Sequence, residues 1–266
     1  MTELPVHRLA TRDGVTLAWR ETGDGRPLVL LHGLMGNGAG LADSEPARTL
    51  AGHGYRVILP DLRGHGDSGG PHDPACYPPD VLADDGLALI DHLGLGDYDL
   101  GGYSLGGRLV LRLLARGARP SRAFVGGQGL DALDEETSRT ESYRRILDAV
   151  ARGDAFAPGS PDEQWAAWIT ASGIDPQAVR YLLDTFAATP QEALRLVPVP
   201  TLIVVGDRDS RGESADALAA LLPDARVVQV PGDHVTAPTA PEFTAAVLDF
   251  LDGRRPGYPR IAGSAP

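Results

Sequence analysis

Short apolar runs recur along the chain and alternate with longer segments in which apolar residues have helical spacing. Runs of this length are typical of strands that are buried on both faces of a sheet. The segments between them carry their apolar residues largely on one side, as on the packed face of a helix. The predicted strands are Leu28–Leu31, Arg56–Leu59, Tyr98–Leu100, Arg122–Val125, Thr201–Val205 and Arg226–Val230, and the clearest helices are Asp80–Leu93, Leu105–Leu114 and Ala215–Leu222.

The order of these elements predicts an α/β fold. Alternating strands and helices form a mostly parallel sheet that helices cover on both faces, with right-handed crossovers. Such sheets bind ligands at the carboxyl ends of their strands. Ahead of the alternating region, Val6–Ala10 and Thr16–Glu21 flank Asp13-Gly14. That dipeptide suits a tight turn, so we expect an antiparallel hairpin near the N-terminus.

The alternation breaks once, between residues 131 and 196, where no strand is predicted. Helical pieces occupy about residues 134–152, 162–172 and 176–187, with turn-rich sequence between them. This stretch is interpreted as a short helical lid inserted after the sixth predicted strand, Arg122–Val125, when the two strands of the N-terminal hairpin are counted. Residues 1–130 and 197–252 then form the core domain, and residues 253–266, rich in Gly, Pro and Arg, form a disordered tail.

Charge and residue usage exclude several classes of function. The chain has 36 Asp and Glu against 24 Lys and Arg, which gives a net charge of −12. Such a chain repels phosphate backbones, so we expect no nucleic-acid partner. Lysine is absent from the sequence, which excludes mechanisms that need a lysine Schiff base or a P-loop lysine.

Cysteine usage and hydropathy indicate where the protein works. Cys76 is the single cysteine of the 266 residues, so the chain forms no internal disulfide and no zinc site built on several thiolates. No signal-peptide core and no uninterrupted apolar segment of membrane-spanning length is present. We therefore expect a cytoplasmic protein without a membrane partner. No motif for a metal or a cofactor is found, and nothing specifies an oligomeric state.

The sharpest motif is Gly102-Tyr103-Ser104-Leu105-Gly106-Gly107, between a predicted strand and a predicted helix. This is the G-x-S-x-G pattern in the strand-turn-helix context that it requires. Small residues on both sides allow the backbone a sharp turn that exposes the hydroxyl of Ser104 above the sheet edge. The sequence therefore predicts Ser104 as a nucleophile.

A serine nucleophile needs a base and a carboxylate that orients it. His234 follows the last predicted strand, at the sheet edge that Ser104 also occupies, and is the predicted base, with His65 as a weaker alternative. Asp209, after strand Thr201–Val205, is the predicted carboxylate, with Asp207 and Asp131 as alternatives. The order Ser, Asp, His along the chain is that of α/β-hydrolases.

The developing oxyanion needs hydrogen-bond donors. The loop after strand Leu28–Leu31 begins with His32-Gly33 and aims the backbone N–H of Leu34, while Leu105 follows the nucleophile at a helix start. These two N–H groups are the predicted oxyanion hole.

Five motifs together resemble the α/β-hydrolase superfamily, in its serine-nucleophile, esterase- and lactonase-like branch. They are His32-Gly33, the segment 60–68, Gly102–Gly107, Gly206–Asp209 and Gly232–His234. The resemblance spans residues 5–252 and implies an eight-stranded sheet with this triad and oxyanion hole. Haloalkane dehalogenases and epoxide hydrolases of the superfamily carry an aspartate at the elbow, where this chain has serine, so those activities are disfavoured.

The sequence favours hydrolysis of an ester, thioester or lactone of a small, rather apolar substrate. His32, Tyr103, Trp165 and Trp168 are candidate pocket residues. One alternative is a carbon-carbon bond hydrolase, or a lyase like that of menaquinone synthesis, in which Arg108 would contact a substrate carboxylate. A non-catalytic receptor for a small molecule is the third hypothesis.

Overall fold

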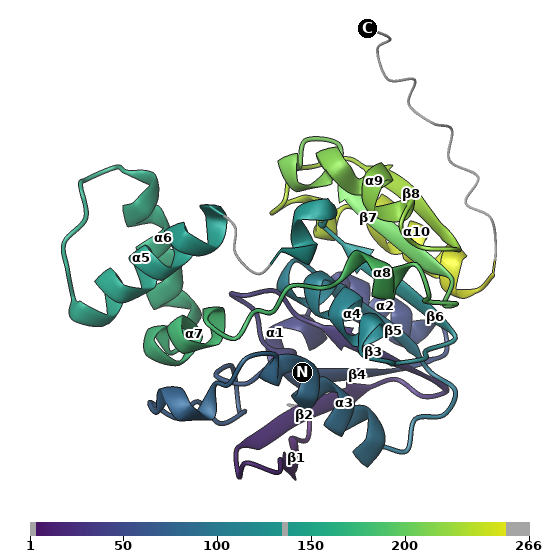
Figure 1. The fold of residues 1–266 in the computed structure, drawn as a ribbon, viewed down its shortest axis with the longest axis horizontal. Coiled ribbons are helices and arrows are strands. Elements are labelled where there is room, and N and C mark those ends of the chain that lie inside the picture. The colour runs from purple at the N-terminus through teal and green to yellow at the C-terminus, as the bar shows by residue number, and fades with distance from the viewer. Residues whose placement is uncertain (1–3, 135–137, 254–266) are drawn as a thin grey trace, which may run out of the picture.

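The strands of the described chain form one eight-stranded sheet in the order β1-β2-β4-β3-β5-β6-β7-β8 (Figure 1). The structure is a computed structural model and describes residues 4–134 and 138–253. β1 pairs with β2 and β2 with β4 in antiparallel fashion, and all other neighbours are parallel. The strands are β1 (His7–Ala10), β2 (Thr16–Thr22), β3 (Arg26–Leu31), β4 (Tyr55–Asp61), β5 (Asp99–Tyr103), β6 (Arg122–Gly126), β7 (Thr201–Gly206) and β8 (Ala225–Val230).

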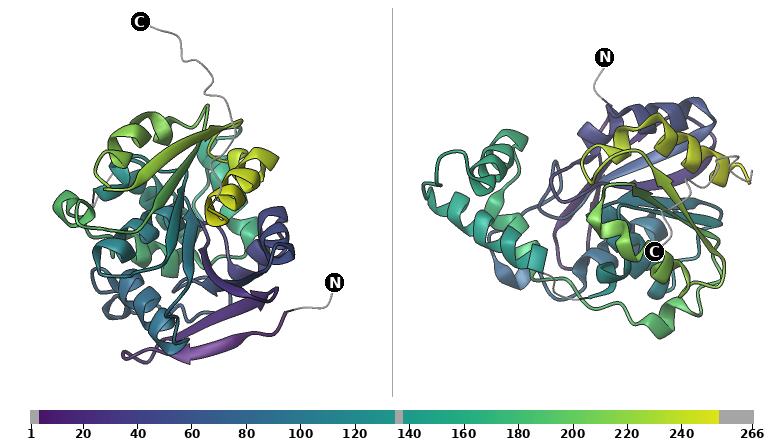
Figure 2. Two further views of the ribbon diagram at one scale, coloured as in Figure 1. Left: turned by 90° about the vertical axis from the view of Figure 1, so that its right-hand side faces the viewer. Right: turned by 90° about the horizontal axis from the view of Figure 1, so that it is seen from above.

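Helices cover both faces of this sheet, as predicted (Figure 2). They are α1 (Gly38–Ala42), α2 (Glu45–Gly52), α3 (Val81–His92), α4 (Leu105–Ala115), α8 (Gln191–Leu194), α9 (Ala215–Ala219) and α10 (Pro241–Leu251), with 3-10 turns at η1 (Pro74–Cys76), η2 (Leu130–Leu133), η3 (Ser210–Ser214) and η4 (Ala237–Thr239). Three further helices, α5 (Ser138–Arg152), α6 (Pro161–Ser172) and α7 (Pro176–Leu183), lie between β6 and β7 in the chain.

The central strands are buried on both faces, because their side chains alternate between two cores. In β3, Val29 and Leu31 join the core under α3, α4 and α9, whereas Leu28 and Leu30 join the core under α2 and α10. Alternation of this kind explains why the strands read as continuous apolar runs in the sequence.

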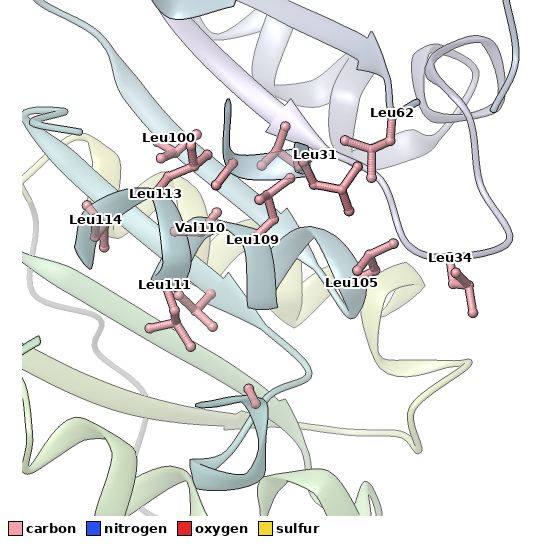
Figure 3. Close-up of a cluster of buried hydrophobic side chains, with 14 of the residues drawn as sticks. Leu31, Leu34, Leu62, Leu100, Leu105, Leu109, Val110, Leu111, Leu113 and Leu114 are labelled. Carbon is pink, nitrogen blue, oxygen red and sulfur yellow. The ribbon is translucent and has the colours of Figure 1, made fainter. Parts of the chain in front are cut away.

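Helix α4, which begins beside the predicted nucleophile Ser104, is buried along most of its length. Its residues Leu109, Val110, Leu113 and Leu114 are buried against Leu100 and neighbouring apolar side chains of the sheet (Figure 3). At roughly 2 kcal/mol for each fully buried leucine, this packing fixes the helix against β5. The N-terminus of α4, which begins directly after Ser104, is therefore held rigidly at the sheet edge.

Helices α5, α6 and α7 stand together on one side of the molecule (Figures 1 and 2). Apolar residues of α5 and α7 pack on each other, including Leu147 and Leu182. These helices occupy the predicted insertion, but α7 ends at Leu183 rather than near residue 187. The expected start of the first helix falls partly on residues 135–137, which lie outside the described residues. The role of the insertion as a lid, and its status as a separate domain, stay predictions. Of the predicted tail, residues 254–266 lie outside the described residues.

Candidate active site

Ser104 lies at a strained turn between β5 and α4. Its backbone angles are φ 56° and ψ −118°, in a region that non-glycine residues rarely adopt. Close contacts impose this turn, because a Cβ on Gly106 would lie 2.1 Å from the carbonyl oxygen of Leu31, and one on Gly102 would lie 2.5 Å from the carbonyl carbon of Gly106. Glycine at both positions lets the strand and the helix approach, and the turn projects Ser104 above the sheet edge.

Ser104, His234 and Asp209 form a continuous hydrogen-bonded chain. The hydroxyl of Ser104 lies 2.9 Å from Nε2 of His234 and can donate to it. On the other side of the ring, Nδ1 lies 2.7 Å from Oδ2 of Asp209. A neutral imidazole that donates from Nδ1 and accepts at Nε2 satisfies both contacts, which is the tautomer a general base needs. The structure thus brings together the three residues that the sequence singled out.

The carboxylate of Asp209 is fixed in the turn that follows β7. Its side chain is almost completely buried, and its Oδ1 accepts a hydrogen bond of 3.0 Å from the backbone N–H of Arg211. The other candidates face different partners. Asp207 is exposed and accepts from the backbone N–H of Gly232 at 2.9 Å, and Asp131 forms an ion pair with Arg139.

Tyr103 holds the loop that carries His234. Its hydroxyl donates to the backbone carbonyl of His234 at 2.9 Å, and the two ring centroids are 5.2 Å apart. Burial and then the charge of Asp209 raise the pKa of Tyr103, so the phenol remains a donor. Tyr103 therefore supports the histidine from behind.

The predicted oxyanion donors lie beside the nucleophile. Leu105 is the first residue of α4, where backbone N–H groups have no acceptor within the helix. The loop after β3 passes close to Ser104, because a Cβ on Gly33 would lie 3.5 Å from the Ser104 Cβ. Leu34 follows Gly33 in this loop. The backbone of both segments can therefore face an oxyanion formed at Ser104.

Two buried histidines brace that loop. His32 donates from Nδ1 to the carbonyl of Gly33 at 2.7 Å and accepts at Nε2 from the N–H of Leu62 at 3.0 Å. His65 donates from Nε2 to the carbonyl of Leu34 at 2.7 Å. His32 therefore fixes the loop rather than facing a substrate, and His65 is engaged away from Ser104.

We expect these histidines to make stability depend on pH. Burial and the nearby His65 lower the pKa of His32 to about 3, from an ordinary value of 6.5, and burial also lowers the pKa of His65. Below about pH 6.5, His32 binds a proton in the unfolded chain but stays neutral in the folded protein. The free energy of unfolding therefore decreases by about 1.4 kcal/mol for each unit that the pH is lowered, from this residue alone.

Urea unfolding near pH 7 and near pH 5 measures this loss. His32→Gln should weaken the dependence of the unfolding free energy on pH. His53→Gln, at the exposed residue that follows α2, should keep the native pH dependence. A His32→Gln protein with the native pH dependence would contradict the role given to His32.

A cavity opens beside Ser104 and encloses about 520 Å³, part of it continuous with solvent. Polar and charged side chains contribute much of its wall. The lining residues are Leu34, Ser104, Leu105, Arg108, Gln128, Asp131, Ala132, Arg139, Thr140, Tyr143, Leu183, Phe186 and Arg211. This wall is more polar than the aromatic residues of the insertion had suggested.

The four candidate pocket residues do not line this cavity. His32 and Tyr103 lie behind the loops that form it, as described above. Trp165 packs on Tyr143 with ring centroids 5.3 Å apart, and Trp168 packs on Trp165 and is 45% exposed. The aromatic pair reaches the cavity only through Tyr143.

Arg211 is a cavity residue that the sequence did not single out and that contacts Ser104, the predicted nucleophile. Its Nη1 donates to Oγ of Ser104 at 3.2 Å and its Nη2 donates to the hydroxyl of Tyr143 at 2.9 Å. Its place two residues after Asp209 was an available signal, because that turn lies at the sheet edge where Ser104, Asp209 and His234 meet.

Within residues 4–134 and 138–253, no three His, Cys, Asp or Glu side chains are grouped so that they could hold a metal ion. Every helix in the same part of the chain is too short or too polar to cross a lipid bilayer.

Comparisons with known proteins identify the family. The model of the alpha/beta hydrolase fold matches residues 26–126, and the chain is 32% identical to a non-heme haloperoxidase of Rhodococcus erythropolis over 90% of this chain and 97% of the relative. The chain belongs to the α/β-hydrolase fold family. The predicted resemblance is thereby confirmed.

Other α/β-hydrolases resemble the chain over most of its length. A 2-(acetamidomethylene)succinate hydrolase of Mesorhizobium japonicum is 32% identical, over 90% of this chain and 92% of the relative. The solved structure of a thermophilic esterase from Thermogutta terrifontis superposes with a TM-score of 0.70 at 25% identity, over 94% of this chain and 98% of that one. The chain is therefore similar to enzymes of this family, hydrolases among them.

Proposed function

We propose that the protein is a serine hydrolase that cleaves an ester, thioester or lactone bond of a small molecule through an acyl-enzyme on Ser104. The observation that carries the proposal is the hydrogen-bonded chain from Ser104 through His234 to Asp209, at 2.9 and 2.7 Å. These distances are those of a nucleophile, its base and the group that orients the base.

In the proposed mechanism, Oγ of Ser104 attacks the acyl carbon while Nε2 of His234 takes its proton. The negative charge that develops on the carbonyl oxygen is stabilised by the backbone N–H groups of Leu34 and Leu105. Collapse of the tetrahedral intermediate breaks the bond to the leaving group, to which His234 returns the proton. Water then attacks the acyl-enzyme by the same steps, and the buried carboxylate of Asp209 stabilises each imidazolium.

The strain at Ser104 supports catalysis over passive binding. A non-glycine residue at φ 56° costs on the order of 1–3 kcal/mol and persists only where surrounding contacts impose it. A receptor gains nothing from a strained serine next to a histidine–aspartate pair.

A carbon-carbon bond hydrolase or a lyase is the alternative that one observation favours. Arg108 lines the cavity, with its guanidinium 4.7 Å from the centroid of the Phe186 ring. It could there meet an acidic substrate, as the alternative requires. The two readings differ in their substrates, since only the primary proposal expects turnover of simple activated esters. The cytoplasmic location stays a prediction.

Labelling with a fluorophosphonate tests the proposal most directly. The probe forms a covalent adduct only on a serine whose base and oxyanion donors are assembled. Intact-protein mass spectrometry should show one adduct on the native protein and on Ser121→Ala, a variant of an exposed serine at the opposite end of the sheet. Ser104→Ala should show none. Labelling that persists in Ser104→Ala would overturn the proposal.

A further inference from the structure

Three arginines line the cavity beside Ser104, in a chain whose net charge is −12. They are Arg108, Arg139 and Arg211, from α4, α5 and the turn η3 after β7. We propose that the substrate carries a carboxylate a few bonds from the scissile carbonyl and that Arg211 binds it. This inference rests on the proposed serine-hydrolase function and names the chemical class of its substrate.

The contacts of Arg211 leave its charge available to a ligand. Its guanidinium donates to two neutral oxygens, Oγ of Ser104 at 3.2 Å and the hydroxyl of Tyr143 at 2.9 Å. None of the ion pairs within the described part of the chain includes Arg211. A half-buried guanidinium without an acidic partner is unfavourable unless a ligand supplies the negative charge.

The surroundings reinforce this positive charge. Burial, and after it the charge of Arg211, lower the pKa of Arg139, so these two guanidinium groups influence each other. Of the acidic groups near the cavity, Asp131 pairs with Arg139, and the carboxylate of Asp209 lies outside the cavity wall, where it contacts His234 and the backbone N–H of Arg211. With three arginines and one aspartate in its wall, the cavity carries an excess of positive charge and favours an anion, although the protein as a whole is acidic.

The position of Arg211 limits where the carboxylate lies on the substrate. Its guanidinium touches Oγ of Ser104, so an anion bound to it sits next to the carbon that Oγ attacks. The fork of N–H donors on an arginine matches a carboxylate in bidentate geometry. A carboxylate bound to the guanidinium of Arg211 also replaces Oγ of Ser104 as its acceptor. This frees the lone pair of Oγ for attack on the carbonyl carbon. A neutral substrate cannot replace Oγ in this way.

Two ester pairs of matched shape test the inference. The first is 4-nitrophenyl butyrate and the 4-nitrophenyl half-ester of succinic acid, which differ in the end of the acyl chain. The second is phenyl acetate and 4-carboxyphenyl acetate, which differ in the leaving group. In at least one pair, the native protein should have a kcat/KM about tenfold or more higher for the anionic member.

Arg211→Met keeps most of the side-chain length but removes the charge. It should lower the ratio of anionic to neutral kcat/KM by about tenfold or more, which removes most of the native preference, as expected for loss of a charge-assisted hydrogen-bonded pair. Arg211→Lys should restore part of the ratio. The control is Arg208→Met, which alters an exposed arginine of the same loop that is absent from the cavity wall and should keep the native ratio.

Salt supplies a test that needs no variant. Added sodium chloride should lower kcat/KM for the preferred anionic ester several-fold more than for its neutral partner. Equal kcat/KM values within both pairs in the native protein, or a ratio that Arg211→Met leaves unchanged, would overturn the inference. Failure of the serine-hydrolase proposal is distinct, because neither the fluorophosphonate nor any ester would then react at Ser104.

Discussion

Replacing His234 by alanine is expected to lower kcat/KM toward activated esters by about 10⁵- to 10⁶-fold. Among the described residues hydrogen-bonded to Oγ of Ser104, the imidazole is the group that can take its proton, since Nε2 accepts from Oγ at 2.9 Å and the other partner of that oxygen, Arg211, is a cation. Without the base, the hydroxyl is a poor nucleophile near neutral pH. Steady-state hydrolysis of a 4-nitrophenyl ester, combined with fluorophosphonate labelling, measures the loss.

Two further variants separate catalysis from packing. Asp209→Asn keeps the shape of the carboxylate and should lower kcat by about 10⁴-fold, because an amide can hold the ring in the wrong tautomer. His53→Ala, at an exposed histidine on the far end of α2, should leave kcat/KM within about twofold of native. A His234→Ala protein that folds and retains more than a hundredth of the native activity would be incompatible with the proposed triad.

Gly106→Ala is expected to destabilise the protein by about 3 kcal/mol or more. The added Cβ would lie 2.1 Å from the carbonyl oxygen of Leu31 and 3.0 Å from that of His32. Both are backbone atoms, so no side-chain rotation relieves the clash. The strand β3 or the start of α4 must shift, and with it the N–H of Leu105. Activity should therefore fall together with stability.

Gly52→Ala provides the matched control. A Cβ at this position meets nothing within 4 Å, and the residue ends the helix α2. Alanine there should change stability by less than about 1 kcal/mol, in the favourable direction. Urea unfolding of both variants measures the contrast. A Gly106→Ala protein as stable as Gly52→Ala would mean that the contact between α4 and β3 yields easily.

The sequence predicted the fold, and it singled out three residues that the structure brings together, because both depend on local pattern. The buried strands appear as apolar runs, and the residues that follow β5, β7 and β8 must meet at one edge of a parallel sheet. Element ends were less predictable. β5 was expected to end at Leu100 but continues to Tyr103, because Gly101 and Gly102 carry no side chain that marks them as part of a strand.

The cavity wall was the part that pattern alone could not supply. Tyr103 and His32 follow predicted strands and were expected to face a substrate. Instead, the Tyr103 hydroxyl donates to the carbonyl of His234, and the His32 ring donates to the carbonyl of Gly33. Arg139 and Arg211 are 72 residues apart in number, and only the docking of α5 over the sheet edge brings them to one cavity. Contacts between distant surface elements leave no periodic signal in a sequence.

The division of the site between two parts of the chain has a consequence for how the protein diverges. Ser104, Asp209 and His234 belong to the sheet edge, whereas Arg139, Tyr143 and Leu183 reach the cavity from α5 and α7. Substitutions in those helices can alter the shape and charge of the wall without moving the three residues of the proposed triad. Selection for a new substrate can therefore act on the helices between β6 and β7 while the proposed triad is inherited intact.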